Sequence, residues 1–231
     1  MIHTVVFIGK FASGKTEGRN IFHTLYPGSE DVSDRILLAQ AVRRDVAGQL
    51  PNQKGMWIGA RSIAFNALDV PDDDLMMRVI DPSILNEVHE GMLHAILKPP
   101  DKSNLRIVEF AIGPDVPLNG GILRQDAKHI FQFFQENLSQ NEILVVEVDA
   151  PLDIRLERNK KRGSTVEDEA FRMYSPDGGE GNPAMAFAYG IPYVRINNTR
   201  DDLYWFEREV FSIAQINVGL EGNSLRNHEL V

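Results

Sequence analysis

One eight-residue segment near the start of the chain, Gly9 to Thr16, constrains the fold more than any other feature. Its sequence, GKFASGKT, matches the phosphate-binding pattern G-x4-G-K-[ST] at every constrained position. The apolar, β-branched run 4–8 before it predicts a buried strand, and residues 14–26 after it have the apolar spacing of a helix. A glycine-rich turn with a chance lysine is the alternative interpretation. The complete spacing, together with the strand and the helix, favours a loop that binds a nucleoside triphosphate.

The residue types in this segment suit that task. Glycine permits the tight turns that aim successive backbone amides at phosphate oxygens, and the helix starting at Gly14 adds the positive end of its dipole. Lys15 is expected to reach the β- and γ-phosphates, and the hydroxyl of Thr16 to bind magnesium. We therefore expect ATP and Mg²⁺ as cofactors. The predicted nucleotide contacts in this loop are Gly9, Ala12, Ser13, Gly14, Lys15 and Thr16.

Composition narrows the class of protein. With 231 residues, of which 43% are hydrophobic and 25% charged, the chain can bury the core of one globular domain. A formal net charge of -9 argues against general attraction to nucleic acid or to an anionic membrane. The chain has no cysteine, which excludes disulfides and thiol catalysis. No apolar stretch is long enough for a signal peptide or a membrane span, so a cytoplasmic location is expected.

Strand-like apolar runs alternate with longer helical patterns along the chain, which is typical of a parallel sheet covered by helices on both faces. The predicted strands are 4–8, 30–33, 105–110, 143–148 and 193–196. The clearest predicted helices are 14–26, 33–48, 122–138, 152–162 and 201–216. These elements predict an α/β fold with a mostly parallel, five-stranded sheet in a single domain over residues 1–219, followed by a flexible tail, 220–231.

A phosphate loop is shared by many kinds of NTPase, so other residues must indicate the reaction. Arg155, Arg158 and Arg162 are spaced by three and four residues, which places them on one broad helix face, and Arg172 follows in a polar, glycine-rich segment. Arginines on a hinged lid, here residues 155–190, are typical of phosphoryl transfer because they neutralise charge on the transferred group. The alternative is a solvated helix face held by pairs such as Glu157 with Lys161.

Several motifs follow the phosphate loop, and their order along the chain helps to indicate the kind of NTPase. The phosphate loop is followed by Asp-Val-Ser-Asp-Arg after the second strand, by Ile-Val-Glu ending at Glu109, by the segment 150–163, and by Asn197-Asn198 before the last helix. This order resembles the P-loop nucleoside and nucleotide kinase family, and the segment 150–163 is similar to the lid entry of dephospho-CoA kinases and adenylate kinases. The resemblance implies a three-layer P-loop kinase fold with a mobile lid, and an acceptor-side helical insert at residues 51–100.

The resemblance also implies roles for residues outside the loop. Asp34 stands where the family has an acidic residue beside the acceptor hydroxyl, and Arg35 would meet an acceptor anion; a helix N-cap is the alternative for Asp34. Glu109 stands where a carboxylate organises magnesium, with Asp149 as the weaker competitor. Arg61, in the insert, is a candidate acceptor contact, although an arginine packed on Trp57 is an equal alternative.

The sequence departs from the monophosphate kinases of this family at one place. They carry an arginine shortly after the third strand, whereas residues 110–115 here contain none. This leaves room for a nucleoside, a coenzyme precursor or another hydroxyl compound as acceptor. A GTPase is disfavoured because the segment 197–201 lacks the lysine of the guanine-specificity motif and no Asp-x-x-Gly switch motif stands where it is needed.

The expected function is therefore ATP-dependent, magnesium-assisted phosphoryl transfer to a small nucleotide-, nucleoside- or coenzyme-like acceptor. Two alternatives remain: a nucleotide-dependent switch whose insert binds a partner, and a polynucleotide 5′-hydroxyl kinase, which the acidic balance disfavours. The predicted catalytic residues are Lys15, Asp34, Arg158 and Arg162, with Arg155 on the nucleotide. The predicted substrate contacts are Asp34, Arg35, Arg61 and Glu109, and the predicted metal site consists of Thr16 and Glu109.

Overall fold

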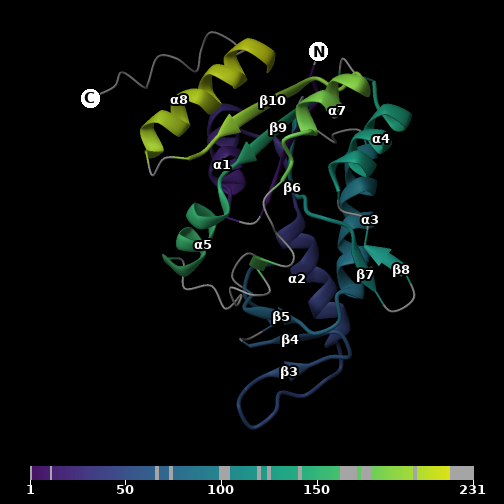
Figure 1. Ribbon diagram of the computed structural model, residues 1–231. Coiled ribbons are helices and arrows are strands. Elements are labelled where there is room, and N and C mark those ends of the chain that lie inside the picture. Colours follow the sequence, from purple (N-terminus) through teal and green to yellow (C-terminus); the bar gives the residue numbers. More distant parts are fainter. Residues whose placement is uncertain are drawn as a thin grey trace. The chain divides into compact units, whose positions relative to one another are not determined.

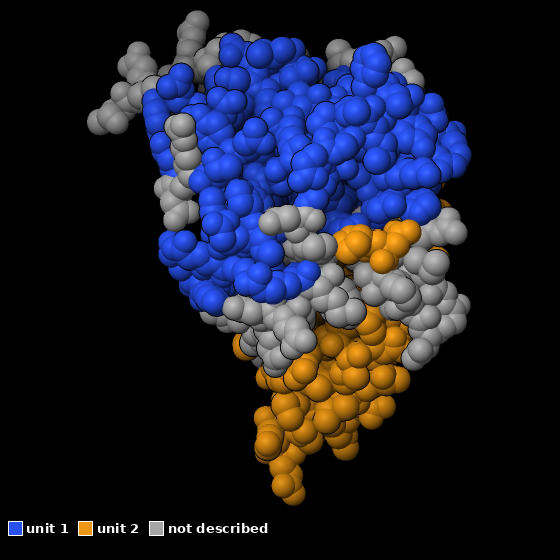
Figure 2. All heavy atoms as spheres, viewed as in Figure 1, with its two compact units in different colours: residues 1–31, 99–113, 126–231 blue, residues 32–98, 114–125 orange. Residues whose placement is uncertain are grey.

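A computed structural model (Figure 1) describes most of the chain. The described residues are 2–10, 12–65, 68–72, 75–98, 105–118, 121–123, 126–139, 142–161, 171–172, 178–199 and 202–218. The chain divides into two compact units, which Figure 2 distinguishes by colour. Unit 1 contains residues 1–31, 99–113 and 126–231, and unit 2 contains residues 32–98 and 114–125.

The central sheet has five strands in the order β10-β9-β1-β6-β2. They are β1 (Thr4–Gly9), β2 (Glu30–Ser33), β6 (Arg106–Ala111), β9 (Ile143–Asp149) and β10 (Tyr193–Asn197). The pairs β1–β6, β1–β9 and β9–β10 are parallel. All five coincide closely with the predicted strands. Parallel strands are buried on both faces, and their apolar, β-branched runs make them easy to recognise in a sequence.

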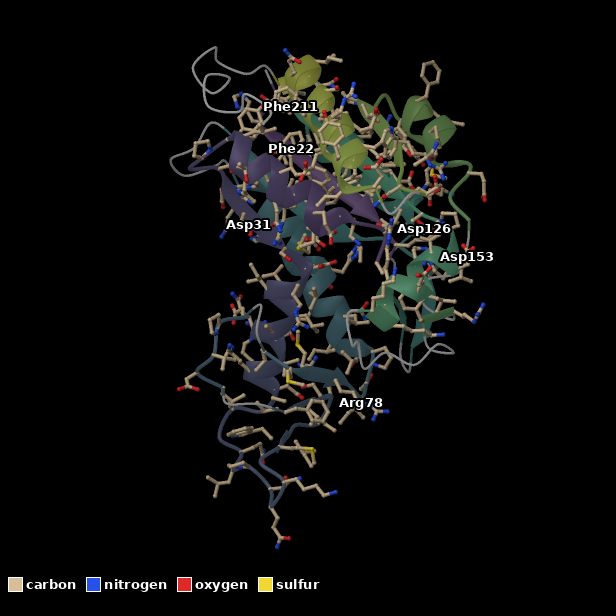
Figure 3. All side chains as sticks on the ribbon, turned by 90° about the vertical axis from the view of Figure 1, so that its left-hand side faces the viewer. Phe22, Asp31, Arg78, Asp126, Asp153 and Phe211 are labelled. Atoms are coloured by element: carbon tan, nitrogen blue, oxygen red, sulfur yellow. The ribbon has the colours of Figure 1, made fainter. Side chains whose placement is uncertain are left out.

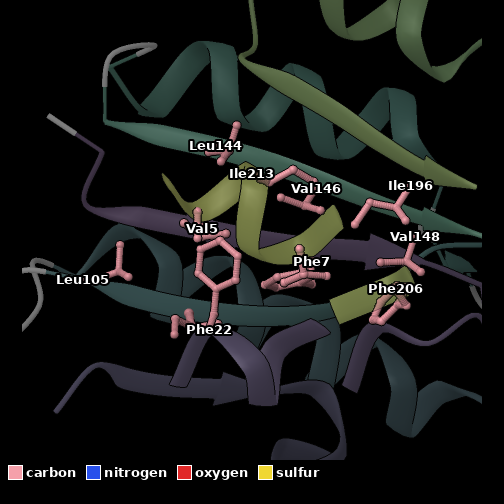
Figure 4. Packing of buried hydrophobic residues seen from close by; sticks show 13 residues of the cluster. Val5, Phe7, Phe22, Leu105, Leu144, Val146, Val148, Ile196, Phe206 and Ile213 are labelled. Atoms are coloured by element: carbon pink, nitrogen blue, oxygen red, sulfur yellow. The ribbon is translucent and has the colours of Figure 1, made fainter. Parts of the chain in front are cut away.

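One face of this sheet packs against α1 (Lys15–Leu25) and α8 (Leu203–Ile213). Alternate residues of β1 point to this side, so Val5 and Phe7 enter the core together, and the Phe7 ring meets the Phe22 ring edge-on at 5.2 Å (Figure 4). Burial of this cluster fixes α1, and with it the phosphate loop that precedes α1. Its other buried members include Leu105, Ile107, Leu144, Val146, Val148, Ile196, Phe206, Val210 and Ile213.

The other face is covered by α4 (Ala127–Asn137) and α7 (Asn182–Ala188). The Phe131 ring of α4 meets the Tyr193 ring of β10 edge-on at 6.1 Å. Helices therefore lie on both faces of the sheet, which confirms the three-layer α/β prediction. Two further helical segments of unit 1 are α5 (Leu152–Lys161) and the π-helical extension of α8, η2 (Ala214–Val218).

Unit 2 combines two helices with short antiparallel strands. Helix α2 (Asp34–Asp45) packs on α3 (Ser83–Leu97). The strands β3 (Trp57–Ile58), β4 (Ser62–Ala64) and β5 (Met77–Val79) form a three-stranded sheet, and β7 (Val116–Leu118) pairs with β8 (Gly121–Leu123). Ser33 is the N-cap of α2, because its hydroxyl accepts a hydrogen bond from the Arg35 amide at 3.2 Å.

Two expectations from the sequence differ from the structure. The insert 51–100 was expected to be helical, but its described residues form the strands β3, β4 and β5 as well as the helix α3. The helix expected at 122–138 begins at Ala127, because Asp126 caps it by accepting a hydrogen bond from the His129 amide at 2.9 Å. The assignment of residues 1–219 to a single domain stays a prediction.

Other parts of the predicted organisation fall outside the described residues. Much of the predicted lid, 162–170 and 173–177, lies there, as does the predicted tail, 220–231. Among the described helices, none has the length and apolar character needed to cross a bilayer.

Candidate active site

The phosphate loop connects β1 to α1 and depends on backbone conformations that favour glycine. Gly9 has φ +155° and Gly14 has φ +110°. A Cβ on Gly9 would lie 2.4 Å from the Val148 carbonyl oxygen, and one on Gly14 would lie 2.4 Å from Asn198 Nδ2. Both glycines are thus required by space as well as by φ. Ala12, with φ +60°, is the one described residue other than glycine in the left-handed region.

The loop has the features of an anion site. Lys15 Nζ donates to the Lys10 carbonyl at 3.0 Å, and the Ser13 amide donates to the same oxygen at 3.3 Å. No side chain caps the first amides of α1, and the buried Ser13 hydroxyl has no hydrogen-bond partner among the described residues. Uncapped amides, a buried hydroxyl and an ammonium group around one turn are donors suited to phosphate oxygens. Phe11, inside the loop, lies outside the described residues.

Glu109 lies directly beside the loop. In β6 it follows Leu105 and Ile107 in the alternation that faces α1, and it is paired with Phe7 of β1. The Thr16 hydroxyl donates to Glu109 Oε1 at 2.8 Å, and Glu109 is only 7% exposed. A hydroxyl and a carboxylate are the hard oxygen ligands that magnesium prefers, so these residues fit the predicted metal site.

Arg158 and Asn198 both contact the phosphate loop at Ser13. Asn198 Nδ2 donates to the Ser13 carbonyl at 2.7 Å, and Arg158 Nη1 donates to the same oxygen at 3.3 Å. Arg158 Nη2 also donates to Asn198 Oδ1 at 3.2 Å. The predicted catalytic arginine is therefore anchored beside the phosphate loop. Asn198 was not predicted to belong to the site, although it stands directly after the last strand, where loops at the carboxyl edge of a parallel sheet gather.

The remaining arginines of the predicted lid behave differently from Arg158. Arg155 is fully buried: its Nε donates to the Ala150 carbonyl at 2.8 Å, and its guanidinium lies 5.7 Å from the centre of the Phe171 ring. Arg172 is exposed and lines a surface hollow with Asp153 and Glu157 of α5. Arg162 lies outside the described residues. The nucleotide contact expected of Arg155 stays a prediction.

Three of the predicted acceptor residues, Asp34, Arg35 and Arg61, belong to unit 2, whereas Glu109 belongs to unit 1. Asp34 is the first residue of α2, next to its N-cap, so the N-cap interpretation of Asp34 is wrong and its acceptor role stays a prediction. Arg35 Nη2 donates to the Leu75 carbonyl at 2.6 Å. Arg61 forms ion pairs with Asp45 at 3.4 Å and with Glu87 at 3.2 Å, and both its acceptor role and its packing on Trp57 stay predictions.

Two carboxylates in unit 2, Asp45 and Glu87, have lowered pKa values because they accept hydrogen bonds. Burial alone would raise the pKa of Asp45, but hydrogen bonds from the Ser62 hydroxyl and from the amide and side chain of Arg61 outweigh it, and the pKa falls. Hydrogen bonds from Arg44 and Arg61 lower the pKa of Glu87. The pairing in turn raises the pKa of Arg61, although burial opposes it.

A second buried polar cluster lies on the α7 side of β9 and β10. Glu147 is 2% exposed; Asn182 Nδ2 donates to its Oε1 at 2.9 Å, and the Tyr193 hydroxyl donates to its Oε2. Burial raises the pKa of Glu147, and these hydrogen bonds offset it only in part. Asp149, the weaker metal candidate, forms an ion pair with Arg195 at 2.5 Å.

Comparison with known proteins identifies the fold. A sugar kinase from Janibacter sp. HTCC2649 matches with a TM-score of 0.50 and 10% identity, over 97% of this chain and 98% of that one. A shikimate kinase from Acinetobacter baumannii, in complex with shikimate, has a TM-score of 0.47 and 13% identity, over 92% and 93%. The tunicamycin resistance protein of Deinococcus radiodurans has a TM-score of 0.45 and 15% identity, over 96% and 98%.

The Janibacter match confirms the predicted fold and, at its low identity, the fold alone. We draw nothing from the two lower scores. No family model and no curated protein matches the sequence. The chain thus has the α/β fold of a P-loop kinase, and the narrower likeness to dephospho-CoA kinases gains no support.

Proposed function

We propose that this protein is a kinase that transfers the γ-phosphoryl group of ATP, with magnesium, to a hydroxyl group of a small molecule. The observation that carries the proposal is the 2.8 Å hydrogen bond from Thr16 Oγ1 to Glu109 Oε1, which joins the last residue of the loop to a buried carboxylate of the next strand. A hydroxyl and a carboxylate are the kind of oxygen ligands that magnesium prefers, so this pair beside the phosphate loop supports the proposed metal site.

The chain supplies the groups that phosphoryl transfer requires. Loop amides and Lys15 would hold the triphosphate, Thr16 and Glu109 would hold magnesium, and Arg158 would move from the Ser13 carbonyl to the transferred group. Magnesium would neutralise charge on the β- and γ-oxygens. Asp34 would orient the acceptor hydroxyl. Positioning and charge neutralisation would supply most of the rate acceleration.

The arginines of unit 2 favour an acceptor without a phosphate. Arg35 binds a backbone carbonyl, Arg43 pairs with Asp72 at 3.0 Å, and Arg44 and Arg61 both pair with Glu87. Of the arginines described in this unit, Arg78 alone lacks such a partner, and it is exposed on β5 (Figure 3). A bidentate clamp for an acceptor phosphate would have to break one of these pairs. A hydroxyl compound, such as the sugar named for the Janibacter enzyme, fits better.

The test is phosphorus NMR of the protein with ATP, magnesium and a panel of sugars, polyols, nucleosides and coenzyme precursors. A new phosphate ester that forms with one class of acceptor supports the proposal. Lys15→Ala should abolish turnover, whereas Lys54→Ala, an exposed lysine of unit 2, should not. Asp34→Asn should spare ATP binding and reduce transfer. ATP hydrolysis that ignores every small molecule and responds to a macromolecule would instead indicate the nucleotide-dependent switch.

A further inference from the structure

Helix α1 carries a second residue toward Glu109. Thr16 and Arg19 are three residues apart, so they lie on the same side of the helix. Gly18, between them, lets α1 approach the sheet closely: a Cβ there would lie 2.7 Å from the Phe7 ring. This close approach brings the Arg19 side chain down to the strands.

Arg19 lies between two carboxylates from neighbouring strands. Its Nη1 is 3.3 Å from Glu109 Oε2 of β6 and 3.7 Å from Asp31 Oδ1 of β2. The Arg19 and Glu109 side chains are each 9% exposed, and Asp31 is 33% exposed. Figure 3 shows Asp31 beside α1. The two oxygens of Glu109 are therefore divided: Oε1 accepts from Thr16, and Oε2 faces Arg19.

The burial of Arg19 is costly in stability. Burying a guanidinium removes its hydration, and a buried ion pair rarely repays that cost in full. Its Nε is buried without a hydrogen-bond partner among the described residues, so the cost is not fully offset here. Apolar side chains in place of a buried ion pair often leave stability unchanged or raise it, so stability alone does not explain an arginine at this position. The pairing occupies Glu109 Oε2 and leaves Oε1 to accept from Thr16.

We propose that Arg19 is a positioning residue for the metal site: it holds Glu109 Oε2 so that Oε1 stays directed at Thr16, the residue with which it would hold magnesium. Asp31 anchors the guanidinium from the other side. This inference rests on the proposed function, because it assigns Arg19 to the metal site of that function. Residues that orient a metal ligand typically change metal affinity by about 10- to 100-fold when removed.

The experiment compares ATP binding with and without magnesium by calorimetry, in the wild type and in Arg19→Met. We expect the enhancement of ATP affinity by magnesium to fall about tenfold in Arg19→Met, while binding of metal-free ATP stays within about twofold. Manganese binding to the ATP complex, followed by electron paramagnetic resonance, should weaken in parallel. Arg19→Lys keeps the charge but cannot span both carboxylates, so an intermediate loss is expected.

Arg106→Met is the matched control. Arg106 is 1% exposed and pairs with Glu30 at 2.7 Å, so it too is a buried arginine that bridges β6 and β2, at the first residue of β6 and three residues before Glu109. This control should lower stability and leave the magnesium enhancement unchanged. The same enhancement in Arg19→Met and the wild type would overturn the inference. Should Arg19→Met not fold, an unchanged enhancement in Arg19→Lys would overturn it equally.

Failure of the proposed function gives a different result. If magnesium fails to enhance ATP binding in the wild type, the metal site itself is wrong, whatever the variants do. If the wild type shows the enhancement and Arg19→Met retains it, the metal site stands and only the role of Arg19 is lost.

Discussion

Asn198 and Ser13 are joined by a 2.7 Å hydrogen bond from the side-chain amide of one to the backbone carbonyl of the other, which fastens the end of the last strand to the phosphate loop. Asn198 is 6% exposed, and its own amide donates to the Asp149 carbonyl at 2.6 Å. Asn198 thus ties the Ser13 backbone of the loop to the end of β9. Contacts that fix a backbone segment in advance reduce the ordering cost of ligand binding, so this hydrogen bond should favour nucleotide binding at Ser13.

Gly14→Ala tests how tightly this contact constrains the loop. The new Cβ would meet Asn198 Nδ2 at 2.4 Å at a φ of +110°, so we expect destabilisation by roughly 2–4 kcal/mol and loss of ATP binding. The measurement is urea unfolding together with calorimetry. Gly28→Ala is the control, because Gly28 has φ +89° and open space around it, and it should cost about 1 kcal/mol without affecting ATP. Equal losses in both variants would show that backbone strain alone is responsible.

Substitutions of Arg155 and Arg158 should have different effects: the first should lower stability, and the second should lower turnover. Arg155→Met removes the donor to the buried Ala150 carbonyl and the contact with Phe171, and should lower stability by about 1–3 kcal/mol. Arg158→Met should leave stability within about 1 kcal/mol of the wild type and lower turnover roughly a hundredfold. Thermal unfolding and the kinase assay measure the two effects. A stable Arg155→Met protein that has lost ATP binding would restore Arg155 to the nucleotide site.

The sequence predicted the parts of the fold that are fixed by local pattern. The phosphate loop and the five strands were predictable because buried parallel strands are continuous apolar runs and the loop has a constrained spacing. The strands β3, β4 and β5 have only two or three residues each, too few to show alternation, and Asp45 of α2 positions β4 through the Arg61 amide and the Ser62 hydroxyl. Such tertiary contacts are not visible in a local pattern.

In the candidate site, too, the features set by local spacing were predictable and those set by tertiary contacts were not. Thr16 and Glu109 were predicted together and are hydrogen bonded, whereas Arg19 was missed because its partners come from two distant strands. The three-residue spacing of Thr16 and Arg19 was the signal that could have found it. Spacing also placed Arg155 and Arg158 on one face but could not reveal that Arg155 is buried against Phe171.

Asp45→Asn should reduce the amount of stability that unit 2 loses as the pH falls. The folded-state pKa of Asp45 lies below its unfolded value of about 3.9, so its contribution is present above that pH and is lost as pH falls through the folded pKa. At neutral pH the loss of charged hydrogen bonds to Arg61 and Ser62 should cost about 1–3 kcal/mol. Fluorescence of Trp57 in β3 reports this unit once Trp205 is replaced by Phe. If the stability of the wild type and of Asp45→Asn falls equally with decreasing pH, the stabilising role assigned to the lowered pKa of Asp45 is contradicted.

Glu147→Gln should act on stability with the opposite dependence on pH. The folded-state pKa of Glu147 is raised above its unfolded value of about 4.3, so its favourable contribution is complete below that pH and is lost as pH rises through the folded pKa. Burial and the same carboxylate also raise the pKa of Tyr193, so its hydroxyl remains a donor throughout. Glutamine keeps an acceptor without a charge, and Glu147→Gln should therefore gain stability relative to the wild type as pH increases. Urea unfolding followed by Trp205, with Trp57 replaced by Phe, measures this change in unit 1. Glu142→Gln, an exposed carboxyl just before the same strand, is the control, and an identical pH profile for both variants would refute the role of burial at Glu147.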